Sequence, residues 1–140
     1  MNSALPWELH APLVRDTATV GELSLSRVLA MRDANYPWLI LVPRQAGAVE
    51  IIDLDSERQA ELMDEIALLS QVLKDVTQCD KLNIAAIGNL VPQLHVHVVA
   101  RRRGDAAWPR PVWGTVPPRP YRPGELETFI ARIRGEIAFG

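Results

Sequence analysis

The chain has 140 residues, of which 48% are hydrophobic and 23% are charged, and its formal net charge is -2 at pH 7. This length and composition predict one folded domain over residues 1–140 and exclude a disordered chain. The charge balance excludes the strong positive field that holds polymeric nucleic acid or an anionic membrane. Because Cys79 is the single cysteine and neither a secretory leader nor an apolar run of about 20 residues is present, we expect a soluble cytoplasmic protein.

The first part of the chain predicts a helix followed by two strands. Apolar residues at helical spacing predict a short helix over residues 6–18. The pattern of residues 23–31 is first alternating and then apolar, which predicts a strand, and the short apolar run 38–42 between two prolines predicts a second one. The turn between these two strands makes a hairpin the expected arrangement.

The rest of the chain adds two helices and two strands. Ser56 followed by Gln59 has the pattern of a capping box and predicts the start of a long helix over residues 56–77. The remaining predicted elements are two strands and a last helix, over residues 82–87, 93–100 and 125–138. Since the strands do not alternate with crossover helices, the predicted fold class is α+β, with an antiparallel sheet, packed helices, a long central helix and a C-terminal helix.

The candidate catalytic residues lie in the strand predicted over residues 93–100. Side chains alternate between the faces of a strand, so Gln93, His95 and His97 are expected on one face and apolar side chains on the other. Two imidazoles and an amide at this spacing suit a small anionic group such as a phosphate. A neutral imidazole that is oriented through its second nitrogen is a competent nucleophile near pH 7, and His95 is the central residue.

Two other interpretations of the histidine pair stay open. Histidines in a half-buried strand are often structural, with their ring nitrogens hydrogen-bonded. A His-x-His pair can also offer two nitrogens to zinc, which needs four ligands. No further His, Cys, Asp or Glu lies between Lys81 and Gly104, so a metal site at His95 and His97 would need distant carboxylates to complete it.

Features downstream of the histidine strand also have a structural and a functional interpretation. The arginine triplet 101–103 could steer an anionic nucleotide, but charge runs at the ends of elements are commonly solvated, and we expect a solvated strand end. Trp108 and Trp113 could stack on a base, whereas loop tryptophans more often cover a core edge or an interface.

The stretch of residues 83–99, with its Gln-x-His-x-His run followed by two valines, resembles the histidine triad (HIT) superfamily of nucleotide hydrolases and transferases. The resemblance extends over about residues 23–114 and includes the Trp-Pro and Trp-Gly pairs of the downstream loop. It implies a five-stranded antiparallel sheet with packed helices and a homodimer. It also implies a small-molecule nucleotide as substrate and chemistry that needs no metal or other cofactor.

The resemblance gives a role to each matching residue. His95 matches the central nucleophile, which forms a covalent nucleotidyl-histidine intermediate, and His97 matches the third histidine, which contacts the same phosphate. Asn83 matches a residue near the nucleotide, Asn89 a residue that binds phosphate or leaving group, and Asp33 an acidic residue that holds the ribose hydroxyls.

Gln93 departs from the family pattern, because the hydrolases of the family carry a histidine at this first triad position. An amide does not titrate near pH 7 and cannot serve as a general acid. The sequence therefore predicts a nucleotide hydrolase or transferase with Gln93, His95 and His97 as its catalytic set, acting on a nucleoside 5′-phosphoryl compound. The alternatives are a nucleotide-binding or interaction module of the same fold with little turnover, and a metal enzyme that uses the two histidines.

Overall fold

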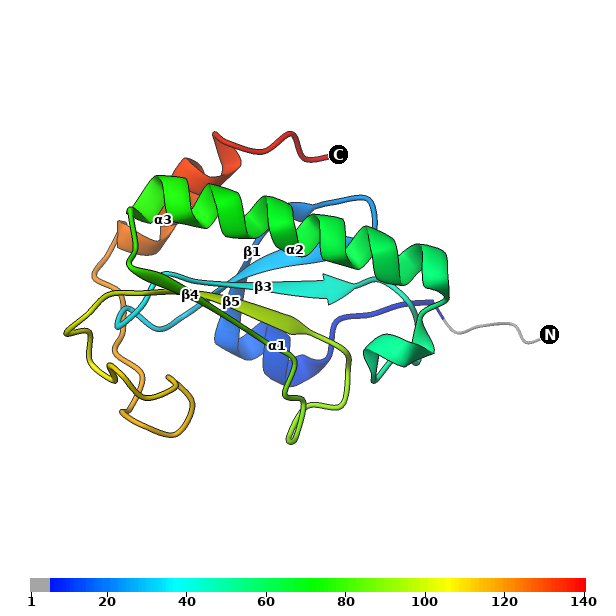
Figure 1. Ribbon diagram of the computed structural model, residues 1–140, viewed down its shortest axis with the longest axis horizontal. Helices are drawn as coiled ribbons and strands as arrows, with labels where there is room; N and C mark the ends of the chain where they lie inside the picture. The colour runs from blue at the N-terminus through cyan, green and yellow to red at the C-terminus, as the bar shows by residue number, and fades with distance from the viewer. Residues whose placement is uncertain (1–5) are drawn as a thin grey trace.

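A computed structural model describes residues 6–140, in which five strands form one antiparallel sheet of order β1-β2-β3-β5-β4 (Figure 1). The strands are β1 (Thr17–Glu22), β2 (Ser26–Met31), β3 (Trp38–Pro43), β4 (Lys81–Ala85) and β5 (Val96–Arg101). The helices are α1 (Ala11–Asp16), α2 (Ser56–Thr77) and α3 (Glu125–Arg134), and a short 3-10 helix, η1, spans Ile51–Asp53. The architecture confirms the predicted α+β class with its antiparallel sheet, long helix and C-terminal helix. None of the described helices is long and apolar enough to cross a membrane.

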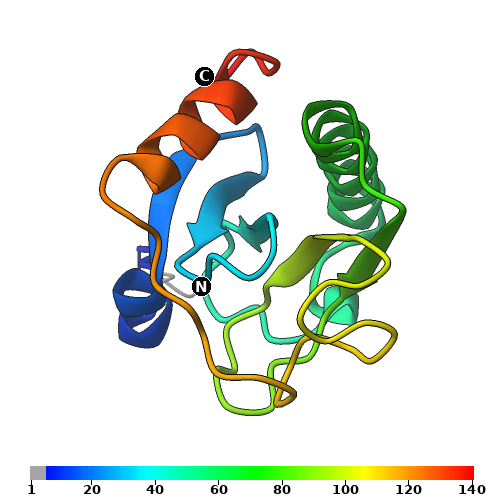
Figure 2. The same cartoon turned by 90° about the vertical axis from the view of Figure 1, so that its left-hand side faces the viewer.

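Two apolar layers cover the two faces of the sheet (Figure 2). One face packs against α2 and α3, whose Leu69 and Ile133 are fully buried. The other face packs against α1 and the loop after β5, through Leu13 and Val112. His97 faces this second layer, because it alternates along β5 with valines of the first layer.

The helix predicted over residues 6–18 was too long at both ends. At its start, backbone groups of Glu8 and His10 bond with the Gln93 side chain instead of with a helical turn. At its end, the chain enters β1 at Thr17, a strand that the sequence analysis missed and that pairs with β2. The β-branched residues of this Thr-Ala-Thr-Val segment favour extended backbone, and the partner strand completes the hydrogen bonding.

The predicted strands are present, but their bounds differ by a few residues. The expected hairpin forms, because β2 and β3 pair in antiparallel register. β5 begins at Val96 and not at residue 93, since the N–H of Leu94 donates to the carbonyl of Ala48 and not to a neighbouring strand. Gln93 and His95 therefore lie in the segment that leads into the strand.

The long helix α2 has the predicted range, but its N-cap is Asp55 and not Ser56. The Asp55 carboxylate accepts a hydrogen bond from the backbone N–H of Arg58 at 2.8 Å. The Gln59 amide donates to the carbonyl of Leu54 at 2.8 Å, so it does not close the expected capping box. A carboxylate at the N-cap also interacts favourably with the positive end of the helix dipole.

The expectation that the triplet 101–103 is solvated is wrong for Arg101. Its side chain is fully buried and forms two hydrogen bonds with the Asp105 carboxylate, at 2.8 and 2.9 Å. A third hydrogen bond joins it to Oδ1 of Asn83 at 2.8 Å. Arg101 thus connects β4, β5 and the loop after β5, and the other two arginines of the triplet are exposed.

Asp55→Ala should lower the free energy of unfolding by about 1 kcal/mol, because it removes the side-chain cap of α2. Ser56→Ala is the matched control at the neighbouring position and should change this free energy by only a few tenths of a kcal/mol. Urea unfolding followed by circular dichroism measures both. A larger loss in Ser56→Ala than in Asp55→Ala would show that the capping assignment is wrong.

Candidate functional site

His95 and His97 lie side by side where β5 enters the sheet between β3 and β4. The centroids of the two rings are 5.0 Å apart, and the ring planes are inclined by 73°. Both side chains are buried, on the side of the sheet that packs against α1. The structure therefore brings together the two histidines that the sequence analysis selected.

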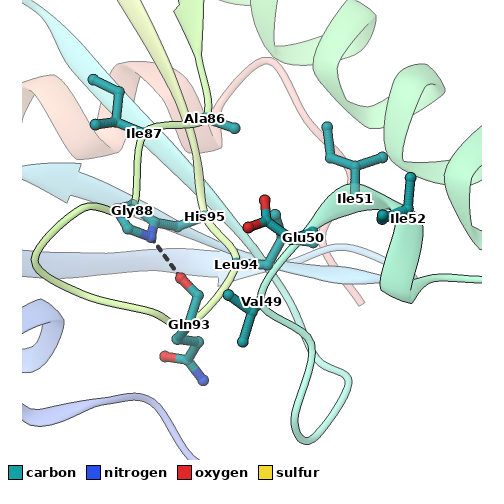
Figure 3. A pocket seen from close by; sticks show the side chains of 10 residues that line it. All are labelled: Val49, Glu50, Ile51, Ile52, Ala86, Ile87, Gly88, Gln93, Leu94 and His95. Atoms are coloured by element: carbon teal, nitrogen blue, oxygen red, sulfur yellow. Dashed lines mark hydrogen bonds between the residues drawn. The ribbon is translucent and has the colours of Figure 1, made fainter.

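The ring of His95 is oriented by one hydrogen bond. Its Nδ1 lies 2.7 Å from the backbone carbonyl oxygen of Gln93 (Figure 3). A carbonyl oxygen can only accept, so in the neutral ring Nδ1 carries the proton and Nε2 keeps a free lone pair. Nε2 of His95 is therefore the nitrogen that can attack an electrophile.

His97 has the opposite tautomer. The indole N–H of Trp38 donates to its Nδ1 at 3.0 Å, so in the neutral ring the proton is on Nε2. Burial, and secondarily the neighbouring His95, lower the pKa of His97 from 6.5 to about 3. Trp38 and Trp113 pack edge-on against the ring, with centroids 5.6 and 5.1 Å away. His97 is thus a neutral hydrogen-bond donor at physiological pH.

The Gln93 side chain is not directed at the two imidazoles. Its Nε2 donates to the carbonyl of Glu8 and its Oε1 accepts from the N–H of His10, both at 2.9 Å. These two bonds use the amide to attach the N-terminal segment, while the backbone carbonyl of the same residue holds His95. The expected convergence of an amide and two imidazoles on one anion is not present. Gln93 thus connects residues 8–10 with His95.

The two asparagines, Asn83 and Asn89, differ in whether their side chains are free to bind a ligand. Asn83 lies opposite Val99 in the β4–β5 pair, and its Oδ1 accepts from the buried Arg101 guanidinium. Asn89 is exposed in the loop after β4, next to Gly88, whose φ of +65° is in the left-handed region that favours glycine. Only Asn89 is placed in the loop that borders His95.

Asp33 lies at the far end of the sheet from His95. It sits in the turn between β2 and β3, before the start of β3, whereas Val96 pairs with Leu41 near the end of β3. Its Oδ1 accepts from the backbone N–H groups of Asn35 and Arg119, at 2.9 and 3.2 Å. The structure gives Asp33 a role in closing this turn and does not bring it to the histidines.

A pocket of about 500 Å³ borders His95 between η1 and the end of β4 (Figure 3). His95 lies beside Gly88 on one side of it, and Glu50, Ile51 and Ile52 lie on the other side. The other residues of the lining are Val49, Ala86, Ile87, Gln93 and Leu94. The sequence analysis missed residues 49–52. Their Val-Glu-Ile-Ile run is apolar and lies in the connection between a glycine and a long helix, which could have indicated a ligand-binding loop.

His95 and His97 are two potential metal ligands, but zinc needs four. Across residues 6–140, no group of three or more His, Cys, Asp and Glu side chains is arranged to hold a metal ion. The distant carboxylates that a zinc site would require are therefore not gathered around the two histidines.

A family model described as the HIT domain matches residues 13–104, which include β1 to β5 and both histidines. The chain therefore belongs to the HIT domain family. No curated protein matches it.

Several solved structures are similar to this chain over almost its whole length. The crystal structure of a histidine triad protein from Bradyrhizobium japonicum is 59% identical, with a TM-score of 0.94, and covers 96% of this chain and 100% of that one. Histidine triad proteins from Sinorhizobium meliloti and Marinobacter aquaeolei are each 44% identical, with TM-scores of 0.91 and 0.90. These matches cover 94% and 93% of this chain, and 97% and 95% of the respective relatives.

The stability of the protein should depend on pH through His97. Between about pH 3 and 6.5 the unfolded chain binds a proton at this residue that the folded chain does not bind. The free energy of unfolding therefore falls as the pH is lowered from 6.5, by up to about 1.4 kcal/mol per pH unit from this one group. His97→Gln, which keeps an acceptor for Trp38, should lack this part of the slope in urea unfolding at pH 4 to 7. Equal slopes for both proteins would contradict the low pKa.

Gln93→Ala should lower the free energy of unfolding by about 1 to 3 kcal/mol, because it leaves two backbone groups without their partner. Hydrogen exchange at the His10 amide should accelerate in the same variant. Gln71→Ala is the control, since the Gln71 amide bonds only with Asp75 on the exposed face of α2. Unchanged exchange at His10 would show that the Gln93 amide does not hold the N-terminal segment in solution.

Proposed function

We propose that this protein cleaves a nucleoside 5′-phosphoryl compound through a covalent nucleotidyl-histidine intermediate on His95. The observation that carries the proposal is the hydrogen bond between His95 Nδ1 and the Gln93 carbonyl, which leaves Nε2 free beside a pocket. Membership of the HIT domain family supports the same chemistry.

The reaction has two displacements at the α-phosphorus. In the first, Nε2 of His95 forms a bond to phosphorus, the bond to the leaving group breaks, and its electron pair departs with that group. The ring then carries a positive charge, which the hydrogen bond from Nδ1–H to the Gln93 carbonyl stabilises. In the second, water or another acceptor attacks phosphorus and releases the nitrogen, so that the neutral ring is restored.

His97 offers the phosphate a hydrogen-bond donor from a ring that carries no net charge. Its Nε2–H lies on the ring that is adjacent to His95, and burial keeps its pKa low, so that the ring is neutral before substrate binds. Gln93, at the first triad position, positions His95 and does not donate a proton to the leaving group, because its amide is bonded to the backbone of Glu8 and His10. The leaving group therefore takes its proton from water.

The other residues to which the resemblance gives a role differ in how many existing hydrogen bonds must break before they can bind a nucleotide. Asn89 is exposed and can turn toward a phosphate or leaving group. Asn83 and Asp33 would have to give up their bonds to Arg101, Asn35 and Arg119 before they held a nucleotide.

We also retain the homodimer and the cytoplasmic location as proposals from the family. For the homodimer, the edge strand β4 with its half-exposed Ile84 is a suitable surface.

His95→Ala should reduce release of nucleoside monophosphate by at least about a thousandfold while leaving the circular dichroism spectrum unchanged. Mass spectrometry would follow product from nucleoside phosphoramidates, dinucleoside polyphosphates and nucleotide sugars. An acid quench of wild-type protein with substrate should show a nucleotidyl adduct that His95→Ala lacks. His10→Ala is the matched control, because His10 is the third histidine of the chain and its side chain is exposed.

Full activity in folded His95→Ala would refute the nucleophile. The alternative of a binding module makes a different prediction for the same measurements. Wild-type protein would bind nucleotide without releasing product, and Gln93→His would create turnover.

A further inference from the structure

The proposed reaction needs the two neighbouring histidines to carry their protons at different positions. In its neutral form an imidazole has one N–H and one lone pair, and the ring centroids of His95 and His97 are only 5.0 Å apart. The Gln93 carbonyl fixes His95 with its lone pair on Nε2. A different contact must keep the lone pair of His97 away from the phosphate, because the hydrogen bonds of Gln93 do not include that ring.

Trp38 makes this contact from the neighbouring strand. His97 pairs with Ile40 of β3, and Trp38 is two residues from Ile40 on the same face of the sheet, so the two rings are diagonal neighbours. The indole N–H donates to Nδ1 of His97 at 3.0 Å. An indole N–H can donate and cannot accept, so Nδ1 keeps its lone pair and the proton stays on Nε2. Trp38 is buried, which keeps water from replacing this hydrogen bond.

Trp113 contacts the same imidazole without such a bond. Its ring centroid lies 5.1 Å from that of His97 with the planes inclined by 69°, close to the 5.6 Å and 63° of Trp38. Its Nε1 is buried, however, and has no hydrogen-bond partner among the residues that the structure describes. Two tryptophans therefore pack on His97 in similar geometry, and only Trp38 acts on its proton.

The position of the His97 proton has a direct effect on chemistry at phosphorus. An N–H near the phosphate oxygens stabilises the negative charge that they carry in the transition state. A lone pair in its place would repel these oxygens, and it would offer phosphorus a second nucleophile. The tautomer of His97 therefore decides whether the ring assists the attack by His95 or opposes it.

We propose that Trp38 is a positioning residue of this reaction: by bonding with Nδ1 it holds His97 in the donor tautomer and leaves the attack on phosphorus to His95 alone. The inference rests on the proposed function of His95. Trp38 exchanges no proton and makes no bond with the substrate, since it acts only through His97. Trp113 packs on the ring without this role.

The test compares Trp38→Phe with Trp113→Phe, because both variants remove an indole from the same imidazole and only the first removes a hydrogen bond. Two-bond proton–nitrogen correlation spectra identify the protonated nitrogen of each neutral ring. We expect wild-type protein to show the Nε2–H tautomer for His97 and the Nδ1–H tautomer for His95. In Trp38→Phe the His97 signals should move to those of a mixture of tautomers, and the His95 signals should stay. In Trp113→Phe neither ring should change its tautomer.

Kinetics connect the tautomer with the reaction. With a nucleoside phosphoramidate as substrate, kcat/KM of Trp38→Phe should be about tenfold or more below that of Trp113→Phe, since loss of an aligned donor to the reacting group slows reactions by at least this factor. Calorimetric binding of adenosine 5′-monophosphate should weaken in the same order. If Trp38→Phe does not fold, 3-benzothienylalanine at position 38 keeps the shape of the side chain and replaces its N–H by sulfur.

An unchanged His97 tautomer in Trp38→Phe overturns the inference. Equal changes in the two variants also overturn it, because packing and not the hydrogen bond would then set the ring. The same holds for a changed tautomer with equal kcat/KM and equal nucleotide binding in both variants. If wild-type protein releases no product, the proposed function fails, and the spectra together with nucleotide binding still decide the role of Trp38.

Discussion

The chemistry of the site depends on the hydrogen bond between His95 Nδ1 and the Gln93 carbonyl. This bond decides the tautomer of the ring, and in that tautomer Nε2 keeps a free lone pair. The carbonyl is itself held in place, because the side chain of the same residue is bonded to the backbone of Glu8 and His10. A segment remote in sequence thus contributes to the orientation of the His95 ring through Gln93.

The two histidine rings and the pocket beside them are built by different parts of the fold. The two rings are set by the sheet and by the aromatic side chains on the α1 side, where Trp38 fixes His97 as a neutral donor. The pocket wall opposite His95 comes from η1, on the connection between β3 and α2. Since η1 lies outside the sheet, its residues can differ between relatives while the histidines keep their geometry.

The sequence was sufficient for the α+β class, for every strand except β1 and for the histidine pair, because these follow from periodicity. Alternation along β5 places His97 on one face and Val96 and Val98 on the other, and the apolar stripe of α2 is regular from Leu62 to Leu73. The sequence was insufficient where a long-range partner decides the outcome. Nothing near Arg101 in the sequence indicates that Asn83, 18 positions earlier, accepts a hydrogen bond from its guanidinium. Nothing near Gln93 indicates that its amide bonds with the backbone of Glu8 and His10, which lie 85 and 83 positions earlier in the chain.

The contact between Gln93 and the N-terminal segment uses only main-chain atoms of residues 8 and 10. The side chains at these two positions are exposed and take no part in it. Almost any amino acid can therefore replace Glu8 or His10 without loss of the contact, and proline at position 10 is the exception because it has no N–H to donate. The attachment is preserved by the path of the backbone, so an alignment of relatives would show variation at both positions and a constraint at position 93 alone.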